Sequence, residues 1–407
     1  MPGYHPGVTL HLLLRLFHCL LPCLLALGMA TAAAVPYTPA ADSEVMERLP
    51  ARATDPRARE MLALRQAWRA QPQHLPTALR LAERYQLEVA ATGDPRFMGY
   101  AQAVLQPWWA LPEPPPAVRV LRAVVLQFDH RFEPALADLA AALRAEPDNA
   151  AAWAWQTAIQ MVRADYALAR LSCEQLARLA APLVGAACRA QVDAATGRAA
   201  AASGALRAAL QAEAGADPAL RTWSLTRLAE IDERRADFAA AEAAFGQALA
   251  TGEPDVYLLA AHADFLIDRG RAAEVLALLK DRGRADVLLL RLVLAARATG
   301  NAAADGYAAE LAARFDAARR RGDTSHRKEE ARFLLAKPGR ESAAAALVLA
   351  RENWAEQREA ADARVLLEAA LAAGEPAAAA PVTRWLAETG FESVALQALA
   401  ARLKAPR

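Results

Sequence analysis

The sequence predicts an all-α protein, a right-handed α-solenoid of stacked helical hairpins preceded by a signal peptide. Apolar and small residues recur every 34 positions, and the 55% hydrophobic content is raised by alanine, the best helix former. The recurring positions are Phe132, Ala135, Leu139, Ala142 and Leu143, then Tyr166, Ala169, Cys173, Leu176 and Ala177, with a further copy at Phe238, Ala241, Phe245, Ala248 and Leu249. Such a period indicates hairpins that each bury one face on the next.

Residues 1–34 have the order of a secretory signal peptide. Arg15 supplies a positive flank, the apolar run from Leu16 to Met29 follows, and Ala32 and Ala34 are the small residues that signal peptidase needs. We expect cleavage near Ala34 and a periplasmic or secreted protein. The alternative is an uncleaved inner-membrane anchor, although the run is short for a membrane span of about 20 residues.

Breaks in the periodic pattern divide the rest of the chain. We expect a flexible lead-in over 35–55, N-terminal helical hairpins with a Pro- and Trp-rich break over 56–115, a degenerate repeat array over 116–316 and further repeat-like helices over 317–407. The tryptophans of the break, Trp108 and Trp109, either face a partner or pack on the neighbouring hairpin. The expected hairpins begin near Pro116, Ala150, Leu183, Thr222, Val256 and Asp286.

Small residues also stand where two helices of one hairpin must approach closely, at Ala123, Ala229 and Ala263. With these positions and the 34-residue period, the chain from Pro116 to Asp316 resembles the tetratricopeptide repeat (TPR) family. The resemblance implies that the first helix of each hairpin lines a concave groove that holds a protein or peptide. The residues so placed are Val120, Val124, Phe128, Ala154, Ala158, Met161, Val162, Glu230, Glu233, Arg234, Tyr257, Asp264 and Asp268. That groove would change from apolar to acidic along its length. The alternative is that the superhelix simply shields the apolar positions.

Charge and motifs argue against several other classes of function. The 47 basic and 46 acidic residues nearly cancel, whereas a nucleic-acid-binding protein usually shows a basic excess or stripe. No phosphate-binding loop, dinucleotide fingerprint or nucleophile elbow occurs in the sequence, and no set of residues suggests a cofactor. We therefore expect a non-enzymatic protein without a cofactor. Contact with a membrane is expected only through an uncleaved signal or a membrane-protein partner.

The stretch from Phe315 to Glu330 departs from the alanine-rich pattern and is rich in charge. One interpretation is structural: a helix ends in arginines and Gly322, and Thr324 or Ser325 caps the next helix. The other is a recognition patch for a partner, because arginine and tryptophan are favoured at binding hot spots. This patch would be extended by Asn353, Trp354, Gln357, Arg358 and Glu359. The candidate partner-binding residues are Arg320, Arg321, His326, Arg327, Trp354 and Arg358.

The same region is loosely similar to exported bacterial repeat proteins that accompany metal-related membrane permeases. The similarity rests on the stretches from Arg321 to Phe333 and from Asn353 to Glu359. It implies, as an alternative function, an accessory subunit of an envelope metal-handling or permease system. His326 and Glu329 lie one helical turn apart, but two ligands do not close a metal site. We therefore expect no metal ligands.

Two cysteines, Cys173 and Cys188, remain after removal of the signal peptide. In the repeat register they fall on adjacent helices, where a disulfide is geometrically feasible. An oxidising compartment would favour that bond. The alternative is two small buried side chains, since both positions belong to the repeat core.

Overall fold

The structure is a computed structural model that describes residues 41, 55–252 and 254–404. The expected signal peptide lies outside the described residues, and so does the expected lead-in except for Ala41 and Asp55. The chain divides into two compact units, Met1–Arg59 and Glu60–Arg407. The described part of the second unit is built of α-helices and one short 3-10 helix, with no strand.

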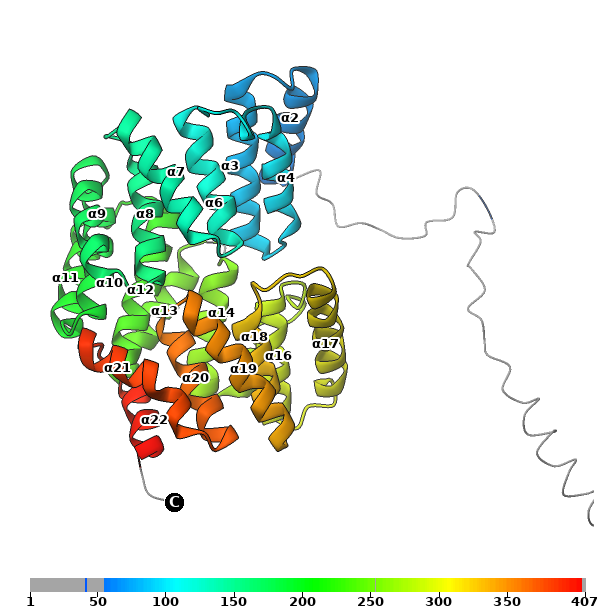
Figure 1. The fold of residues 1–407 in the computed structure, drawn as a ribbon, viewed down its shortest axis with the longest axis vertical. Helices are drawn as coiled ribbons and strands as arrows, with labels where there is room; N and C mark the ends of the chain where they lie inside the picture. Colours follow the sequence, from blue (N-terminus) through cyan, green and yellow to red (C-terminus); the bar gives the residue numbers. More distant parts are fainter. Residues whose placement is uncertain (1–40, 42–54, 253, 405–407) are drawn as a thin grey trace, which may run out of the picture. The chain divides into compact units, whose positions relative to one another are not determined.

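The second unit is a run of helical hairpins in which, from α3 to α17, each helix packs against the next one in the chain (Figure 1). The N-terminal helices are α2 (Pro56–Ala70), α3 (Leu75–Thr92), α4 (Arg96–Val104) and the single turn α5 (Gln106–Trp109). The hairpins that follow are α6 (Pro116–Phe128) with α7 (Phe132–Ala145), α8 (Ala150–Val162) with α9 (Tyr166–Leu179), α10 (Pro182–Ala195) with α11 (Ala199–Ala212), α12 (Pro218–Arg234) with α13 (Phe238–Ala250), α14 (Val256–Asp268) with α15 (Ala272–Leu278), and α16 (Asp286–Ala298) with α17 (Ala304–Arg320). The predicted all-α, TPR-like solenoid is therefore confirmed.

The predicted first residue of a hairpin is correct for four of these helices, α6, α8, α14 and α16. The fourth hairpin was expected at Thr222 but begins at Pro218. Asp217 accepts hydrogen bonds from the amides of Ala219 and Leu220, at 2.9 and 3.2 Å. A capping aspartate followed by proline starts a helix, because proline has no N–H to leave unsatisfied in the first turn.

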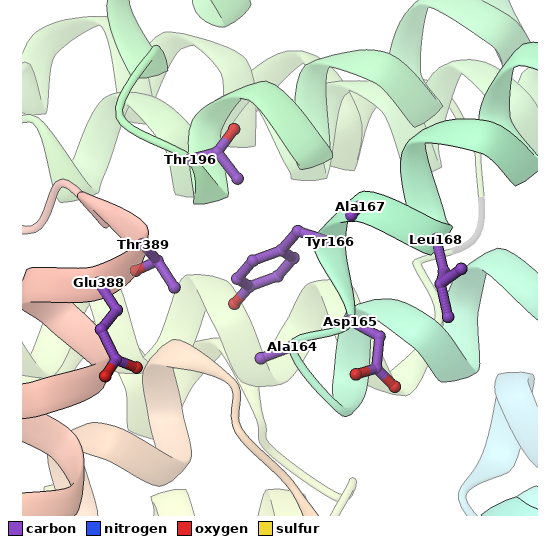
Figure 2. Close-up of a pocket in the computed structure, with 8 residues that line it drawn as sticks. All are labelled: Ala164, Asp165, Tyr166, Ala167, Leu168, Thr196, Glu388 and Thr389. Atoms are coloured by element: carbon purple, nitrogen blue, oxygen red, sulfur yellow. The ribbon is translucent and has the colours of Figure 1, made fainter.

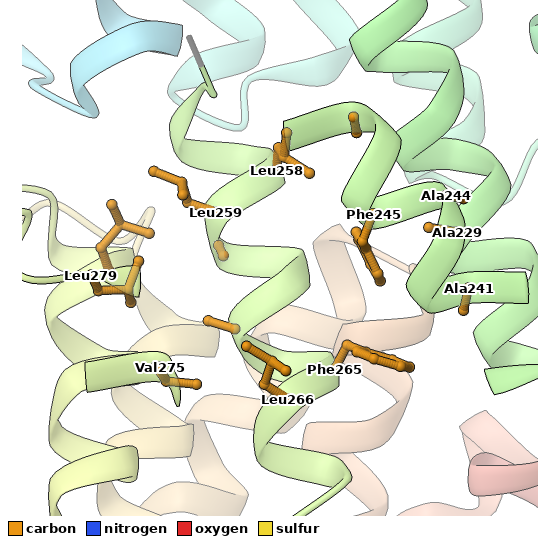
Figure 3. Close-up of a cluster of buried hydrophobic side chains, with 14 of the residues drawn as sticks. Ala229, Ala241, Ala244, Phe245, Leu258, Leu259, Phe265, Leu266, Val275 and Leu279 are labelled. Carbon is orange, nitrogen blue, oxygen red and sulfur yellow. The ribbon is translucent and has the colours of Figure 1, made fainter. Parts of the chain in front are cut away.

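The 34-residue recurrence becomes a continuous core between hairpins. Figure 3 shows Phe245 of α13 and Phe265 of α14 pointing toward each other, with ring centroids 5.5 Å apart. Ala229 and Ala241, both 0% exposed, lie on the facing helices of one hairpin, where a larger side chain would force them apart. Each hairpin therefore completes its core only through its neighbour, as the repeat pattern predicts.

In the Pro- and Trp-rich break after α4, the tryptophans pack on neighbouring helices, which was the second of the two interpretations. Pro107 to Trp109 lie in the short helix α5, and Trp108 and Trp109 pack against a core cluster of α2, α3 and α4 that includes Leu81 and Leu105. Residues between α5 and α6 are not helical, as expected from the prolines there.

The C-terminal helices also pack back on earlier hairpins of the array. They are α18 (Arg327–Leu335), α19 (Arg340–Glu356), α20 (Ala360–Ala373), η2 (Pro376–Ala379), α21 (Ala380–Thr389) and α22 (Val394–Lys404). One core cluster joins Tyr166 and Leu176 of α9 to Trp354, Leu367 and Trp385 of these helices. The last part of the chain thus packs on hairpins that precede it by about 200 residues in sequence.

A close approach of two glycines fixes α21 against the array. Gly197, after α10, and Gly390, after α21, both have positive φ, 76° and 65°. A Cβ atom on Gly197 would lie 3.3 Å from the carbonyl oxygen of Gly390. The positive φ favours glycine at both positions, and at Gly197 the space for a Cβ atom is tight as well.

Among the described helices, none combines the length and apolar character that crossing a membrane requires.

Candidate functional site

The residues expected to line a groove meet the C-terminal helices of the same chain. Asp264 of α14 accepts two hydrogen bonds from Arg332 of α18, both 3.0 Å, and also pairs with Arg291 of α16. One helical turn further on, Asp268 pairs with Arg364 of α20, with one bond at 2.8 Å. Arginines of the same chain therefore neutralise the charges of these two aspartates on the inner face.

Much of the apolar part of the expected groove is covered as well, which favours the alternative in which these positions are shielded. Val120 and Val124 are 6% and 2% exposed and belong to the core between neighbouring hairpins. Ala154 and Met161 pack against the cluster that contains Trp354. Sequence periodicity places these residues on one face of the array but does not show what covers that face.

What stays accessible on the inner face is a set of charged and aromatic side chains, here called the inner polar cluster. It is made of Arg227, Glu230, Glu233, Arg234, Tyr257, Lys328, Arg358 and Glu359. The first four lie on α12 at positions i, i+3, i+6 and i+7, so that helical periodicity brings them to one side. The others come from α14, α18 and the loop between α19 and α20.

Tyr257 is the centre of one wall of this cluster. Its hydroxyl donates a hydrogen bond to Glu230, and the guanidinium of Arg227 lies over its ring, 4.1 Å from the centroid. Arg227 also pairs with Glu230 at 3.1 Å. Tyr257 is nevertheless 48% exposed, so water reaches the ring even though it makes these contacts.

The opposite wall is the loop Gln357–Glu359, which is held in place from both sides. The side-chain amide of Gln357 lies 2.8 Å from Nε2 of His130, and the backbone amide of Arg358 donates a 2.8 Å bond to the carbonyl of Val162. Glu359 caps α20 in a reciprocal capping box with Asp362. The side chains of Arg358 and Glu359 remain exposed.

Electrostatic effects show that the two walls lie near each other. Burial raises the pKa of Tyr257 well above its usual value, and the charge of Glu359 adds to that rise. Burial also raises the pKa of Glu359, whereas the positive charges of Lys328 and Arg227 lower it. Yet among the described residues no hydrogen bond or ion pair joins Glu359 to Arg227 or to Lys328.

Two neighbouring residues of α12, Glu233 and Arg234, lack an ion-pair partner of opposite charge in the described structure. Arg234 donates from Nε to the carbonyl of Glu230 at 3.3 Å and stacks on Phe391 at 4.7 Å, but no carboxylate in the described structure forms an ion pair with it. Burial lowers its pKa. Burial, with the charges of Asp268, Glu230 and Asp264, raises the pKa of Glu233 to about 8.

The residues of the charged patch expected around residue 320 make separate contacts with different neighbours. Arg320 and Arg321 are exposed at the end of α17, where Arg320 pairs with Asp316. His326 lies 3.7 Å from Asp323. Arg327 pairs with Glu352 at 3.2 Å and Glu356 at 2.7 Å, and so ties α18 to α19. These contacts fit the structural interpretation of the stretch, except that the expected cap is wrong: His326, and not Thr324 or Ser325, is the N-cap residue of α18.

Trp354 contradicts the choice of partner-binding residues. It is 6% exposed and packs edge-on against Trp385, with ring centroids 5.4 Å apart. A side chain buried in the core cannot be an exposed anchor for a partner, so this assignment was wrong. Arg358, four residues later, does lie on an accessible wall.

Of the two alternatives for the cysteines, the structure has the disulfide. Cys173 of α9 and Cys188 of α10 are bonded, with Cα atoms 5.6 Å apart and both side chains buried. The bond therefore joins two successive hairpins.

No group of three or more His, Cys, Asp or Glu side chains is placed to hold a metal ion in the part of the chain that the structure describes. The accessory metal-handling role remains a hypothesis. Sequence reasoning included Glu359 in the expected recognition patch but missed Arg227 as a member of a site. The signal for Arg227, a polar residue on the first helix of a hairpin, is present in the sequence but does not identify its partners.

No family model and no curated protein matches the chain. Solved structures give faint likenesses. The human IFIT1 dimer with PPP-AAAA is 15% identical over 82% of this chain and 90% of that chain, with a TM-score of 0.40. The TPR domain of P58(IPK) is 14% identical over 85% of this chain and 97% of that chain, with a TM-score of 0.20. Scores this low carry no argument, so the TPR-like architecture rests on the hairpins themselves.

Proposed function

We propose that the protein is an exported, non-enzymatic interaction scaffold that binds a protein or peptide segment on its inner face. The observation that carries the proposal is the inner polar cluster. Tyr257 and Glu359 stay accessible to water on facing walls, although most other residues of the inner face are paired or buried. Helical-repeat proteins use their inner surfaces for extended partners.

The chemistry of the cluster favours a polar segment over an apolar one. Arg227 and Arg234 offer N–H donors that the chain itself does not fully use, since Arg227 pairs only with Glu230 and no described carboxylate forms an ion pair with Arg234. Glu359 offers acceptors from the opposite wall. A peptide backbone, with its alternating N–H and C=O groups, can satisfy both kinds of group.

Partner capture from an envelope extract with the full chain tests this proposal. Arg227→Gln and Glu359→Gln should each reduce capture of a stoichiometric partner about tenfold, since hydrogen bonds to charged groups contribute about 1.5–3 kcal/mol. Arg320→Gln is the matched control, because it removes one charge from an exposed arginine away from the cluster. Equal capture by all three variants and the unchanged protein would refute the placement on the inner face.

Fractionation tests the export part of the proposal. The protein should be recovered from the periplasm or medium with an N-terminus near residue 35. Recovery with an intact first segment in the inner membrane would support the anchored form instead.

A further inference from the structure

An accessible tryptophan extends the inner polar cluster along α12. Trp223 is 38% exposed and stands at position i of a series that continues with Arg227, Glu230 and Arg234 at i+4, i+7 and i+11. Helical periodicity places these four side chains on one stripe of the helix. In the described structure no hydrogen bond, ring stacking or cation–π contact involves the indole of Trp223. Its exposed ring is therefore free to meet a partner.

The other end of this stripe carries positive charge without a counter-charge. Arg234 packs on Phe391 and forms no ion pair with a described carboxylate. Arg358, in the loop between α19 and α20, has an exposed side chain that also forms no ion pair in the described structure. Both arginines therefore keep guanidinium N–H groups that an anion could accept.

Tyr166 shows that the two arginines lie near each other. Figure 2 shows its ring extending from α9 toward α21. Burial raises the pKa of Tyr166 to about 12, and the charge of Glu359 adds to that rise. The neighbouring indole of Trp385 and the charges of Arg234 and Arg358 oppose it. Because salt screens charges over about 10 Å, both guanidinium groups lie close to this hydroxyl.

The carboxyl groups nearby do not neutralise these two arginines. Glu230 accepts from the hydroxyl of Tyr257 and pairs with Arg227. Glu233, with a pKa of about 8, keeps its proton at neutral pH. Glu359 contributes one negative charge against two positive ones. The excess charge at this end of the stripe is therefore positive, and it complements an acidic group.

The length of α12 between Trp223 and Arg234 sets the size of a segment that could reach both. The two residues lie about three helical turns apart, which is about 16 Å along the helix axis. An extended chain advances about 3.3 Å per residue, so about five residues cover this distance. The ring of Tyr257, 48% exposed, lies beside Arg227 and offers contact to the middle of such a segment.

We propose that this stripe binds an extended peptide segment that carries an aromatic side chain and, about five residues away, an acidic side chain. The aromatic ring stacks on the indole of Trp223, and the side-chain carboxylate meets Arg234 and Arg358. Aromatic stacking and charge-assisted hydrogen bonds from arginine are both directional, so the two contacts fix the position of the segment. This inference rests on the proposed function, because it names the kind of segment that the inner face holds.

Peptide libraries on the immobilised full chain test the spacing. Each library consists of acetylated, amidated peptides with one phenylalanine and one glutamate at a fixed separation, in either order, and random residues that are neither aromatic nor acidic elsewhere. We expect retention to be greatest at separations of about four to six residues. Amidation ensures that no free C-terminal carboxylate contributes. Equal retention at short and long separations, or no retention at any, would overturn the proposal.

Two variants test the two anchors separately. Trp223→Ala should reduce retention of the best library about fivefold and remove the preference for phenylalanine over serine, but keep the preference for glutamate over glutamine. Arg358→Gln should reduce retention about threefold and do the reverse. Damage to the fold would lower both preferences together. Tyr100→Ala, at a 46% exposed ring of α4, and Arg320→Gln are the matched controls and should change neither preference.

The result distinguishes this inference from the proposed function. If Trp223→Ala and Arg358→Gln lower the same preference, or neither, the aromatic and acidic anchors are refuted. The scaffold function then still stands if Arg227→Gln loses partner capture. A retention maximum at the expected separation, together with no partner captured by the unchanged protein, would support this segment and refute the scaffold function.

Discussion

Arg332 of α18 donates two 3.0 Å hydrogen bonds to Asp264 of α14, across 68 residues of sequence. The same carboxylate accepts from Arg291, at 3.1 and 2.5 Å. Burial opposes the charge of Asp264, but the two arginines outweigh it and hold its pKa below the usual value. A single carboxylate thus joins the array to its C-terminal helices.

Asp264→Asn should lower the free energy of unfolding by about 3 kcal/mol, because two guanidinium groups would lose their counter-charge. Arg291 and Arg332 are only 9% and 13% exposed, and an uncompensated buried charge is costly. Urea unfolding of the full chain measures the change.

The matched control is Asp268→Asn, one turn along the same helix. Its partner Arg364 is 31% exposed and keeps Glu368 at 2.7 Å, so the expected loss is about 1 kcal/mol or less. Equal losses in the two variants would mean that burial of the Asp264 contacts does not decide their contribution.

Trp354→Ala should be among the most destabilising single changes in the C-terminal helices, at about 3–5 kcal/mol. The tryptophan fills a core shared by α9, α19 and α21, and its removal leaves a cavity beside Trp385. Thermal unfolding followed by circular dichroism measures it. Arg320→Ala, at a 73% exposed side chain, should shift the midpoint very little. A midpoint for Trp354→Ala close to that of the unchanged protein would show that the C-terminal helices do not share a core with the array.

The sequence allowed the hairpins to be predicted but not what the inner face meets. A hairpin start depends on local signals, so Ala150 and Val256 could be identified from the repeat pattern, with Asn149 and Asp255 as caps. The pairs Asp264–Arg332 and Asp268–Arg364 join helices that are not neighbours in the array, and a periodic pattern holds no information about such pairs.

The error at Trp354 has the same origin. A tryptophan beside arginine and glutamine in a polar stretch has the composition of a binding hot spot. Its burial depends on Tyr166 and Trp385 of the same core, which no local pattern connects to it. The residues of the inner polar cluster were partly predicted, since Glu230, Glu233, Arg234 and Tyr257 follow from the helical register. Glu359 was expected in a recognition patch, but Arg227 was not, and no local pattern relates the two because the return of the C-terminal helices brings them near each other.

The disulfide should stabilise the junction of α9 and α10. It closes a loop with a sequence separation of 15, for which the chain-entropy model gives about 3 kcal/mol. The double variant Cys173→Ala, Cys188→Ala should therefore unfold at lower urea concentration than the unchanged protein, and a reducing agent should produce a similar shift in the unchanged protein but none in the variant. A reductant effect of equal size in both proteins would place its origin outside this bond.

The last prediction concerns pH and the carboxyl group of Glu233. Its pKa is about 8 in the folded protein against an ordinary value of 4.5, because burial and the charges of Asp268, Glu230 and Asp264 outweigh that of Arg364. The folded state therefore keeps a proton that the unfolded chain releases between these values. The free energy of unfolding should fall as pH rises from about 4.5 through about 8.

Glu233→Gln mimics the protonated carboxyl and removes this dependence. We expect the variant to match the unchanged protein near pH 5 and to be more stable above pH 8, by about 1 to 2 kcal/mol. Thermal midpoints over this pH range measure the difference, with Glu341→Gln as the control that should follow the unchanged protein throughout. If Glu233→Gln also follows it above pH 8, Glu233 is ionised in the folded state at neutral pH, and the inner face is more acidic than described here.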